Sequence, residues 1–194
     1  MNSTIIATNQ IFIDSKLLDV VLSRIVISLF DLPTSIDWLV GLSILSIYTA
    51  IALPLGVWQG FLRWNSIASK ATVIKISATS LIAPALLEEL FFRAVLLPHP
   101  SENASLKTVA VCSIVGLLLF VIYHPLNGLT FFPKGRSTFL NPVFLILATL
   151  LGFACTIAYL YAGSILISVV IHWLTVIVWL LCLDGINRLK IISV

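Results

Sequence analysis

Five stretches of about 20 mostly apolar residues run through this chain, and each is long enough to cross a bilayer as a helix. They lie at about residues 38–58, 72–97, 107–123, 139–161 and 164–183. Prolines follow two of them, so we expect the second to end at Pro98 and the third at His124-Pro125. Only 10% of the residues are charged, whereas soluble domains carry roughly 25%. The sequence therefore predicts an all-α, polytopic bundle of about five transmembrane spans.

Residues 16–30 are apolar but carry polar side chains at near-helical spacing, namely Asp19, Ser23, Arg24 and Ser28. We interpret this segment as a short or amphipathic helix that lies in the membrane interface or packs against the bundle. The alternative is a sixth span, which would place Asp19 and Arg24 at some depth. We expect residues 1–194 to form a single membrane domain, with residues 1–37 as its N-terminal amphipathic segment and a core at about 80–183.

Basic residues favour one side of the predicted bundle. Under a five-span arrangement that side holds Arg63, Lys70, Lys75, Lys134, Arg136, Arg188 and Lys190, whereas the opposite loops hold only Glu102 and Lys107. Because cytoplasmic loops are enriched in Lys and Arg, we expect an integral protein of a bacterial-type inner membrane with a cytoplasmic C-terminus. Membrane lipid is then its first partner.

Two other classes of interaction are disfavoured by the composition. The net charge is only +3 and no basic cluster is present, which argues against binding to nucleic acid. Cys112, Cys155 and Cys182 lie within apolar stretches without CxxC spacing. We interpret them as small apolar helix residues rather than disulfide or metal-binding residues.

The second predicted span contains three charged residues, Glu88, Glu89 and Arg93. A charge at the centre of a spanning helix costs about 2.5–3.5 kcal/mol on insertion scales. Glu89 and Arg93 are four residues apart on one helix face, so they can pair. Glu88 lies about 100° away around the helix and needs another polar group or a water-filled cavity.

Two histidines occupy similar positions. His124 closes the third predicted span and His172 lies in the middle of the fifth. Either could be a packing residue by itself, but together with Glu88 they come from three helices and predict one convergent polar site. His99 stands between two prolines and is expected to be an ordinary loop residue.

A carboxylate and two imidazoles suit peptide-bond hydrolysis. A carboxylate in a low-dielectric site is a competent general base near neutral pH, and a histidine can share the proton or stabilise an oxyanion. Glu88, His124 and His172 also match a known ligand set for catalytic zinc, although the HExxH motif is absent. The residues alone leave both mechanisms open.

The sequence resembles the CPBP family, also called CAAX-prenyl or abortive-infection-like intramembrane proteases, over about residues 80–180. Three motifs carry the resemblance: Glu88-Glu89 followed by Arg93, Phe120 followed by His124, and His172 preceded by Ala162-Gly163-Ser164. The resemblance implies a glutamic-type intramembrane endopeptidase without a cofactor, and zinc stays the alternative. It implies that Glu88 activates water with help from His124, that Glu89 and Arg93 brace the site, and that His172 lines the oxyanion side.

One position departs from the family pattern. The family often has an asparagine or similar polar residue four positions after the last histidine, and here that position is Val176, with Thr175 beside it. A non-catalytic membrane binder or chaperone on the same scaffold is therefore the alternative function, and a small proton-coupled carrier is a third. For the protease we expect a peptide or membrane-protein substrate, lipid-modified or membrane-embedded, whose identity the sequence does not give.

Overall fold

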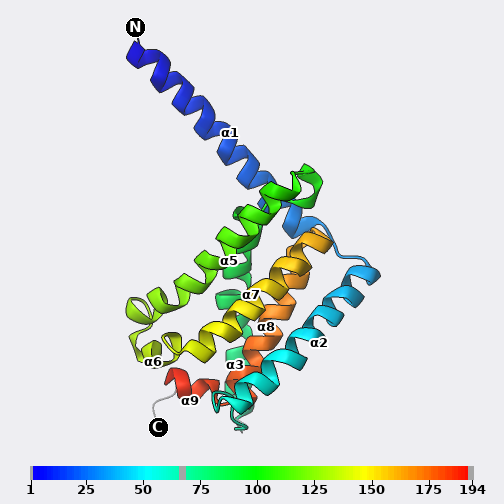
Figure 1. The fold of residues 1–194 in the computed structure, drawn as a ribbon, viewed down its shortest axis with the longest axis vertical. Helices are drawn as coiled ribbons and strands as arrows, with labels where there is room; N and C mark the ends of the chain where they lie inside the picture. The colour runs from blue at the N-terminus through cyan, green and yellow to red at the C-terminus, as the bar shows by residue number, and fades with distance from the viewer. Residues whose placement is uncertain (1, 66–68, 192–194) are drawn as a thin grey trace.

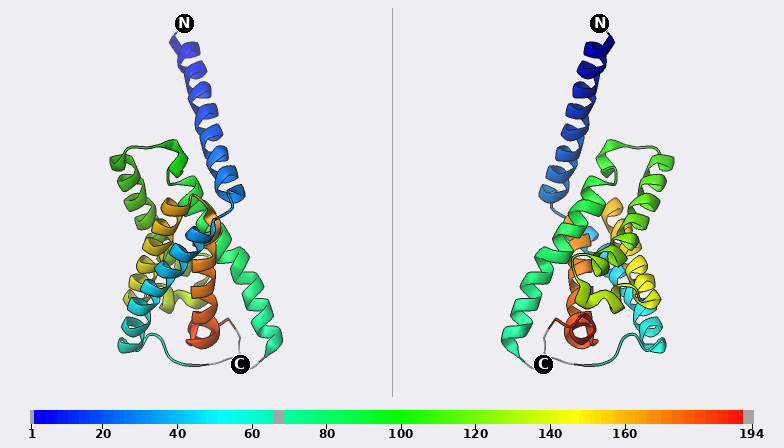
Figure 2. Two further views of the ribbon diagram at one scale, coloured as in Figure 1. Left: turned by 90° about the vertical axis from the view of Figure 1, so that its right-hand side faces the viewer. Right: turned by 90° about the vertical axis from the view of Figure 1, so that its left-hand side faces the viewer.

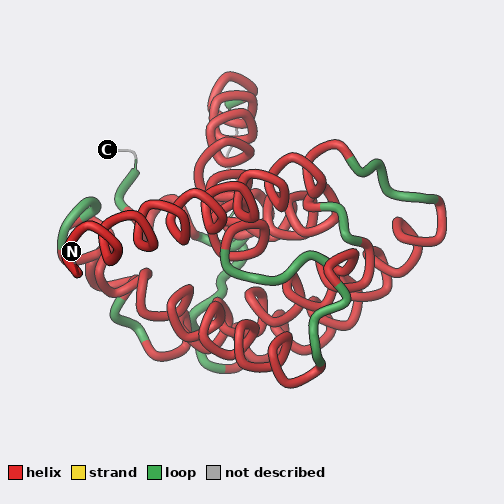
Figure 3. The backbone as a smooth tube through the Cα atoms, turned by 90° about the horizontal axis from the view of Figure 1, so that it is seen from above, coloured by secondary structure: helices red, strands yellow, loops and turns green. Residues whose placement is uncertain are grey.

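The computed structural model describes residues 2–65 and 69–191, with side chains described from residue 16 onward. This part of the chain forms helices joined by short loops, with one isolated bridge between Asn65 and Leu183 (Figure 3). The predicted all-α class is confirmed.

Four helices are long and apolar enough to cross a membrane: α2 (Ser35–Trp58), α5 (Leu106–Leu129), α7 (Pro142–Ala162) and α8 (Ile165–Cys182). They run in similar directions through the bundle, where α7 contacts the other three (Figure 1). Their apolar faces look outward over much of their length, as lipid-facing helices require. The chain is an integral membrane protein with a helical bundle as its fold.

Two predicted helix boundaries were wrong. Helix α5 does not end at His124-Pro125 but continues to Leu129, because a helix in a bundle tolerates the lost N–H of an internal proline. The fourth span was expected from residue 139, yet α7 begins only at Pro142, since Asn141 caps it. Phe139 belongs to the preceding short helix α6 (Arg136–Phe139), which follows η4 (Pro133–Gly135).

The predicted span at residues 72–97 is not one regular helix. It consists of α3 (Lys70–Ser80), the π-helical turn η1 (Leu81–Leu86), α4 (Leu87–Glu89) and the π-helical turn η2 (Leu90–Val95). Ala83 is non-helical, with φ −133° and ψ 117°, and Pro84 follows it without an N–H to donate. Figure 2 shows the N-terminal end of α3 pointing away from the rest of the bundle. The break therefore separates α3 from the stretch that carries the glutamates.

Helix α1 (Asn2–Phe30) is longer than the expected short N-terminal helix, and its N-terminal half projects away from the bundle (Figure 1). Its C-terminal half packs on η2 and α8. Arg24 donates two hydrogen bonds to Glu102, at 2.6 and 2.7 Å, in the short helix η3 (Pro100–Glu102). Buried Ser28 lies 3.3 Å from the Tyr159 hydroxyl, whereas Asp19 is exposed. Residues 24–28 of α1 therefore pack against the bundle.

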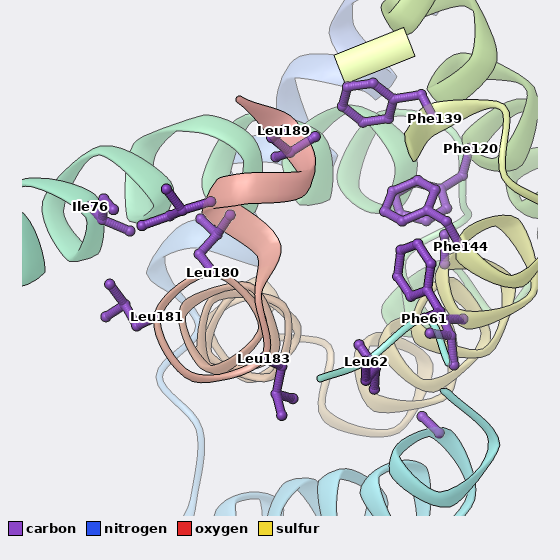
Figure 4. Close-up of a cluster of buried hydrophobic side chains, with 14 of the residues drawn as sticks. Phe61, Leu62, Ile76, Phe120, Phe139, Phe144, Leu180, Leu181, Leu183 and Leu189 are labelled. Carbon is purple, nitrogen blue, oxygen red and sulfur yellow. The ribbon is translucent and has the colours of Figure 1, made fainter. Parts of the chain in front are cut away.

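The largest apolar cluster lies towards the end of the bundle that holds α6 and α9 (Gly185–Leu189). Figure 4 shows its phenylalanines on one side and the leucines around the end of α8 on the other: Phe61, Phe120, Phe139, Phe144, Leu180, Leu181, Leu183 and Leu189. Cys112, Cys155 and Cys182 lie in the described helices as free thiols. The aromatic side of this cluster forms part of the wall of a cavity.

Candidate active site

A cavity of about 950 Å³ lies between α2, α3, α5, α7 and α8. Most of its wall is apolar, but Glu88, His124 and His172 all line it. These residues come from α4, α5 and α8, which are far apart in the sequence. The structure therefore brings the three residues of the predicted polar site to a single cavity.

Glu89 and Arg93 form a fully buried ion pair. Their side chains are 0% and 1% exposed, and Arg93 Nε lies 3.1 Å from Glu89 Oε2. Arg93 also donates from Nη2 to the carbonyl of Gly152, at 3.2 Å, and lies over the ring of Phe120. Because each charge has a partner of opposite sign, the pair can stay in the interior, as the four-residue spacing predicted.

His172 connects this ion pair to the cavity. Its Nδ1 lies 2.9 Å from Glu89 Oε1, and its Nε2 lies 3.8 Å from Glu88 Oε2. A carboxylate paired with an arginine can only accept, so Nδ1 is the nitrogen that carries a hydrogen. The Nε2 atom is then the one that faces Glu88, and Glu89 fixes the orientation of the ring.

Glu88 points away from the ion pair and has the freer carboxyl group. Its side chain is 11% exposed, and among the described residues no group hydrogen-bonds to its buried Oε2 atom. The 3.8 Å separation from His172 is too long for a direct hydrogen bond, but one water molecule could contact both groups. A carboxylate with a free oxygen beside an apolar cavity has the arrangement of a general base.

His124 lies in the last turns of α5 rather than at its end, and it is 8% exposed. Its Nδ1 lies 2.8 Å from the carbonyl oxygen of Phe120, which can only accept, so Nδ1 donates there. The ring packs against Phe120 and Phe144, with centroids 4.8 and 5.3 Å away. In the neutral ring Nε2 is an acceptor that can take up a proton.

The alternative zinc set of Glu88, His124 and His172 is not assembled as a ligand cluster. In the part of the chain that the structure describes, no three His, Cys, Asp or Glu side chains are placed to hold one metal ion together. We therefore derive no step through a metal.

Sequence reasoning missed two features of this region. Gly152 supplies the carbonyl that accepts from Arg93, and a Cβ there would lie 2.8–2.9 Å from side-chain carbons of Leu117 and Phe120. His99 was wrongly expected to be an ordinary loop residue: it is 4% exposed, and its Nε2 lies 2.9 Å from the Gly163 carbonyl. The prolines on either side of His99 are typical of an exposed loop, so no sequence signal indicated this tertiary contact. For Gly152, only the small size of the residue could have indicated a close approach.

A comparison with protein families shows which family this chain matches. The model of the family described as type II CAAX prenyl endopeptidase Rce1-like matches residues 69–178, which is more than half of the chain. The matched segment contains Glu88, Glu89, Arg93, His124 and His172. Neither the curated proteins nor the solved structures gave a match.

Proposed function

Since the chain belongs to the Rce1-like family of type II CAAX prenyl endopeptidases, we propose that it cleaves a peptide bond within the membrane by means of a water molecule activated by Glu88. The observation that carries this mechanism is the carboxyl group of Glu88. It lines the cavity, and its Oε2 atom has no hydrogen-bond partner among the described residues.

The proposed reaction starts when the Glu88 carboxylate removes a proton from water. The water oxygen attacks the carbonyl carbon of the scissile bond, and the carbonyl electron pair moves onto oxygen as an oxyanion. As the oxyanion collapses, the C–N bond breaks and Glu88 returns the proton to the leaving nitrogen. The products are a carboxylic acid and an amine, and Glu88 ends in its starting state.

The neighbouring residues support Glu88 in different ways. The Nε2 atom of His172 lies near Glu88 and can hold the attacking water, while the bond of Nδ1 to Glu89 keeps the ring in place. Arg93 keeps Glu89 ionised in the interior. The Nε2 atom of His124 can share the proton that Glu88 removes. Glu89 and Arg93 are positioning residues in this scheme.

The family and the cavity together favour a membrane-associated peptide as the substrate. The wall of the cavity is mostly apolar, so it suits a lipid-modified or membrane-embedded segment. The beginning of α3, helix α6 and helix α9 lie at the same end of the bundle (Figure 1), and the predicted cytoplasmic basic residues lie in or beside these elements. We propose that this end and the C-terminus face the cytoplasm of a bacterial-type inner membrane.

The test uses purified full-length protein in detergent with two substrate preparations, a farnesylated CAAX peptide and a mixed pool of membrane peptides. Wild type, Glu88→Gln and Glu102→Gln are compared. The last variant is a matched control, because Glu102 lies at η3, outside the cavity. We expect cleavage by the wild type and the control and none by Glu88→Gln, since glutamine cannot accept the proton.

The outcomes separate the possible functions. Cleavage of the farnesylated peptide alone would define a prenyl substrate, whereas cleavage in the pool would identify another peptide. A Glu88→Gln variant as active as the wild type would contradict the mechanism. No cleavage by a well-folded wild type would favour a non-catalytic binder on this scaffold, for which the apolar Val176 in the cavity wall is the supporting observation.

A further inference from the structure

Hydrolysis at Glu88 needs hydrogen-bond donors for the oxyanion, and the histidines of the site offer at most one. The Nδ1–H of His172 is bonded to Glu89, and its Nε2 faces Glu88 whether or not it carries a proton. His124 donates from Nδ1 to Phe120, and its Nε2 is an acceptor while it serves as the partner of the base. A further donor would therefore add to the stabilisation of charge on the substrate oxygen.

The nearest hydroxyl on α8 is also committed. Thr175 lines the cavity one turn after His172, but it donates to the carbonyl of Ile171 at 2.9 Å. Ser80 and Thr79 on α3 similarly donate to carbonyls of their own helix. Val176 has no donor to offer.

Tyr123 has the properties that the reaction requires. It precedes His124 on α5, lines the same cavity and is half-buried. Glu88 lines this cavity as well, on the segment against which the Tyr123 ring packs. Within the described chain no residue forms a hydrogen bond with the Tyr123 hydroxyl, so its O–H is available for a substrate.

Packing holds the ring of Tyr123 in place. Its centroid lies 5.8 Å from that of Phe92, on the segment that carries the glutamates, and 5.8 Å from that of His124. A hydroxyl on a ring fixed between the two catalytic helices needs little reorganisation before the reaction. Tyr48 also lines the cavity, but it lies on α2, which carries none of the residues of the polar site.

We infer that Tyr123 is a further catalytic residue, whose hydroxyl donates a hydrogen bond to the carbonyl oxygen of the scissile bond and stabilises the oxyanion. This inference rests on the proposed function, since it assumes that Glu88 directs water at that carbonyl. It places the substrate carbonyl between α4 and α5, with its oxygen towards Tyr123 and its carbon towards Glu88.

The test is Tyr123→Phe, which removes the hydroxyl and keeps the ring. The matched control is Tyr161→Phe, because Tyr161 is 53% exposed at the end of α7 and does not line the cavity. With the peptide that the wild type cleaves, we expect Tyr123→Phe to lower kcat by about 100- to 1,000-fold with little change in KM. Tyr161→Phe should keep both constants.

A second measurement separates a catalytic role from a structural one. A phosphinic analogue of the cleaved peptide carries tetrahedral oxygens like those of the transition state, so Tyr123→Phe should bind it more weakly by about the factor lost in kcat. Binding of the uncleaved peptide to Glu88→Gln/Tyr123→Phe should match its binding to Glu88→Gln. Thermal unfolding of each variant shows whether the fold is intact.

The results distinguish this inference from the proposed function. Activity that needs Glu88 but survives in Tyr123→Phe at the wild-type kcat would overturn the role of Tyr123 and leave the mechanism standing. Equal loss of affinity for the peptide and its phosphinic analogue would also overturn it, as this indicates ground-state binding. Wild-type activity in Glu88→Gln, or no activity in the wild type, would overturn both.

Discussion

The buried ion pair of Glu89 and Arg93 gives a stability prediction of definite size. Arg93→Met removes the charge that balances Glu89, and the two side chains are 1% and 0% exposed, so water cannot take the place of the arginine. Breaking a buried pair in this way costs about 3–5 kcal/mol, which lowers the folding equilibrium constant by about 150- to 5,000-fold. The loss of the contact between Arg93 and the Phe120 ring adds to the effect.

The measurement is a denaturant titration in detergent, followed with a thiol-reactive dye, because Cys155 is fully buried until the bundle opens. Arg136→Met on the exposed face of α6 is the matched control and should change stability by about 0.5 kcal/mol or less. Adding Glu89→Gln to Arg93→Met removes the unbalanced charge and should restore part of the loss. A cost below about 1 kcal/mol for Arg93→Met would refute the reasoning, since exposed pairs contribute that little.

Three further predictions concern other parts of the molecule. Gly152→Ala should cost about 1–3 kcal/mol through the clash with Phe120, measured by the same titration, and Gly116→Ala, where the nearest contact is 3.2 Å, should cost less. The hydrogen bonds from Arg24 hold the pKa of the Glu102 carboxyl below its usual range. The link between α1 and η3 should therefore be intact above about pH 5 and be lost as the pH falls through the lowered pKa. Distances between spin labels on α1 and α5 should then increase in acid, whereas Glu102→Gln should show the longer distance at every pH. Incubation with a chelator should leave cleavage unchanged, and activity that is lost and then restored by zinc would contradict the metal-free mechanism.

The helices themselves follow closely from the sequence, because the length of an apolar run sets the length of a spanning helix. Their ends follow less well. Proline was expected to stop α5 at residue 125, yet the helix continues to Leu129 because neighbouring helices compensate for the missing N–H. At Pro84, in contrast, the chain does break, with Ala83 in an extended conformation. The same residue type gives both outcomes, so a proline by itself does not predict where a helix ends.

The site could also be predicted only in part, because some of its contacts depend on how the helices pack together. The pair of Glu89 and Arg93 depends only on helical spacing within one segment, and the structure contains it. The bond between His172 and Glu89 depends on how α8 is rotated against α4, which one sequence without structural context does not fix. The family resemblance implies that His172 lines the oxyanion side, and this role stays a prediction. The distance of 3.8 Å between its Nε2 and Glu88 supports the proposal that it also holds the attacking water.

The break at Ala83 and the free carboxyl of Glu88 are connected. Helix α3 contacts α8 close to the break, where Trp173 Nε1 donates to the carbonyl of Ser77 at 2.8 Å. Thr79, Ser80, Ala83 and Pro84, on both sides of the break, line the cavity that Glu88 also lines. The segment around the break therefore forms part of the cavity wall, whereas Glu89 is fully buried. Two adjacent glutamates thus lie in different surroundings: one is held by an arginine in the interior, and the other lines the cavity in which we propose that the substrate binds.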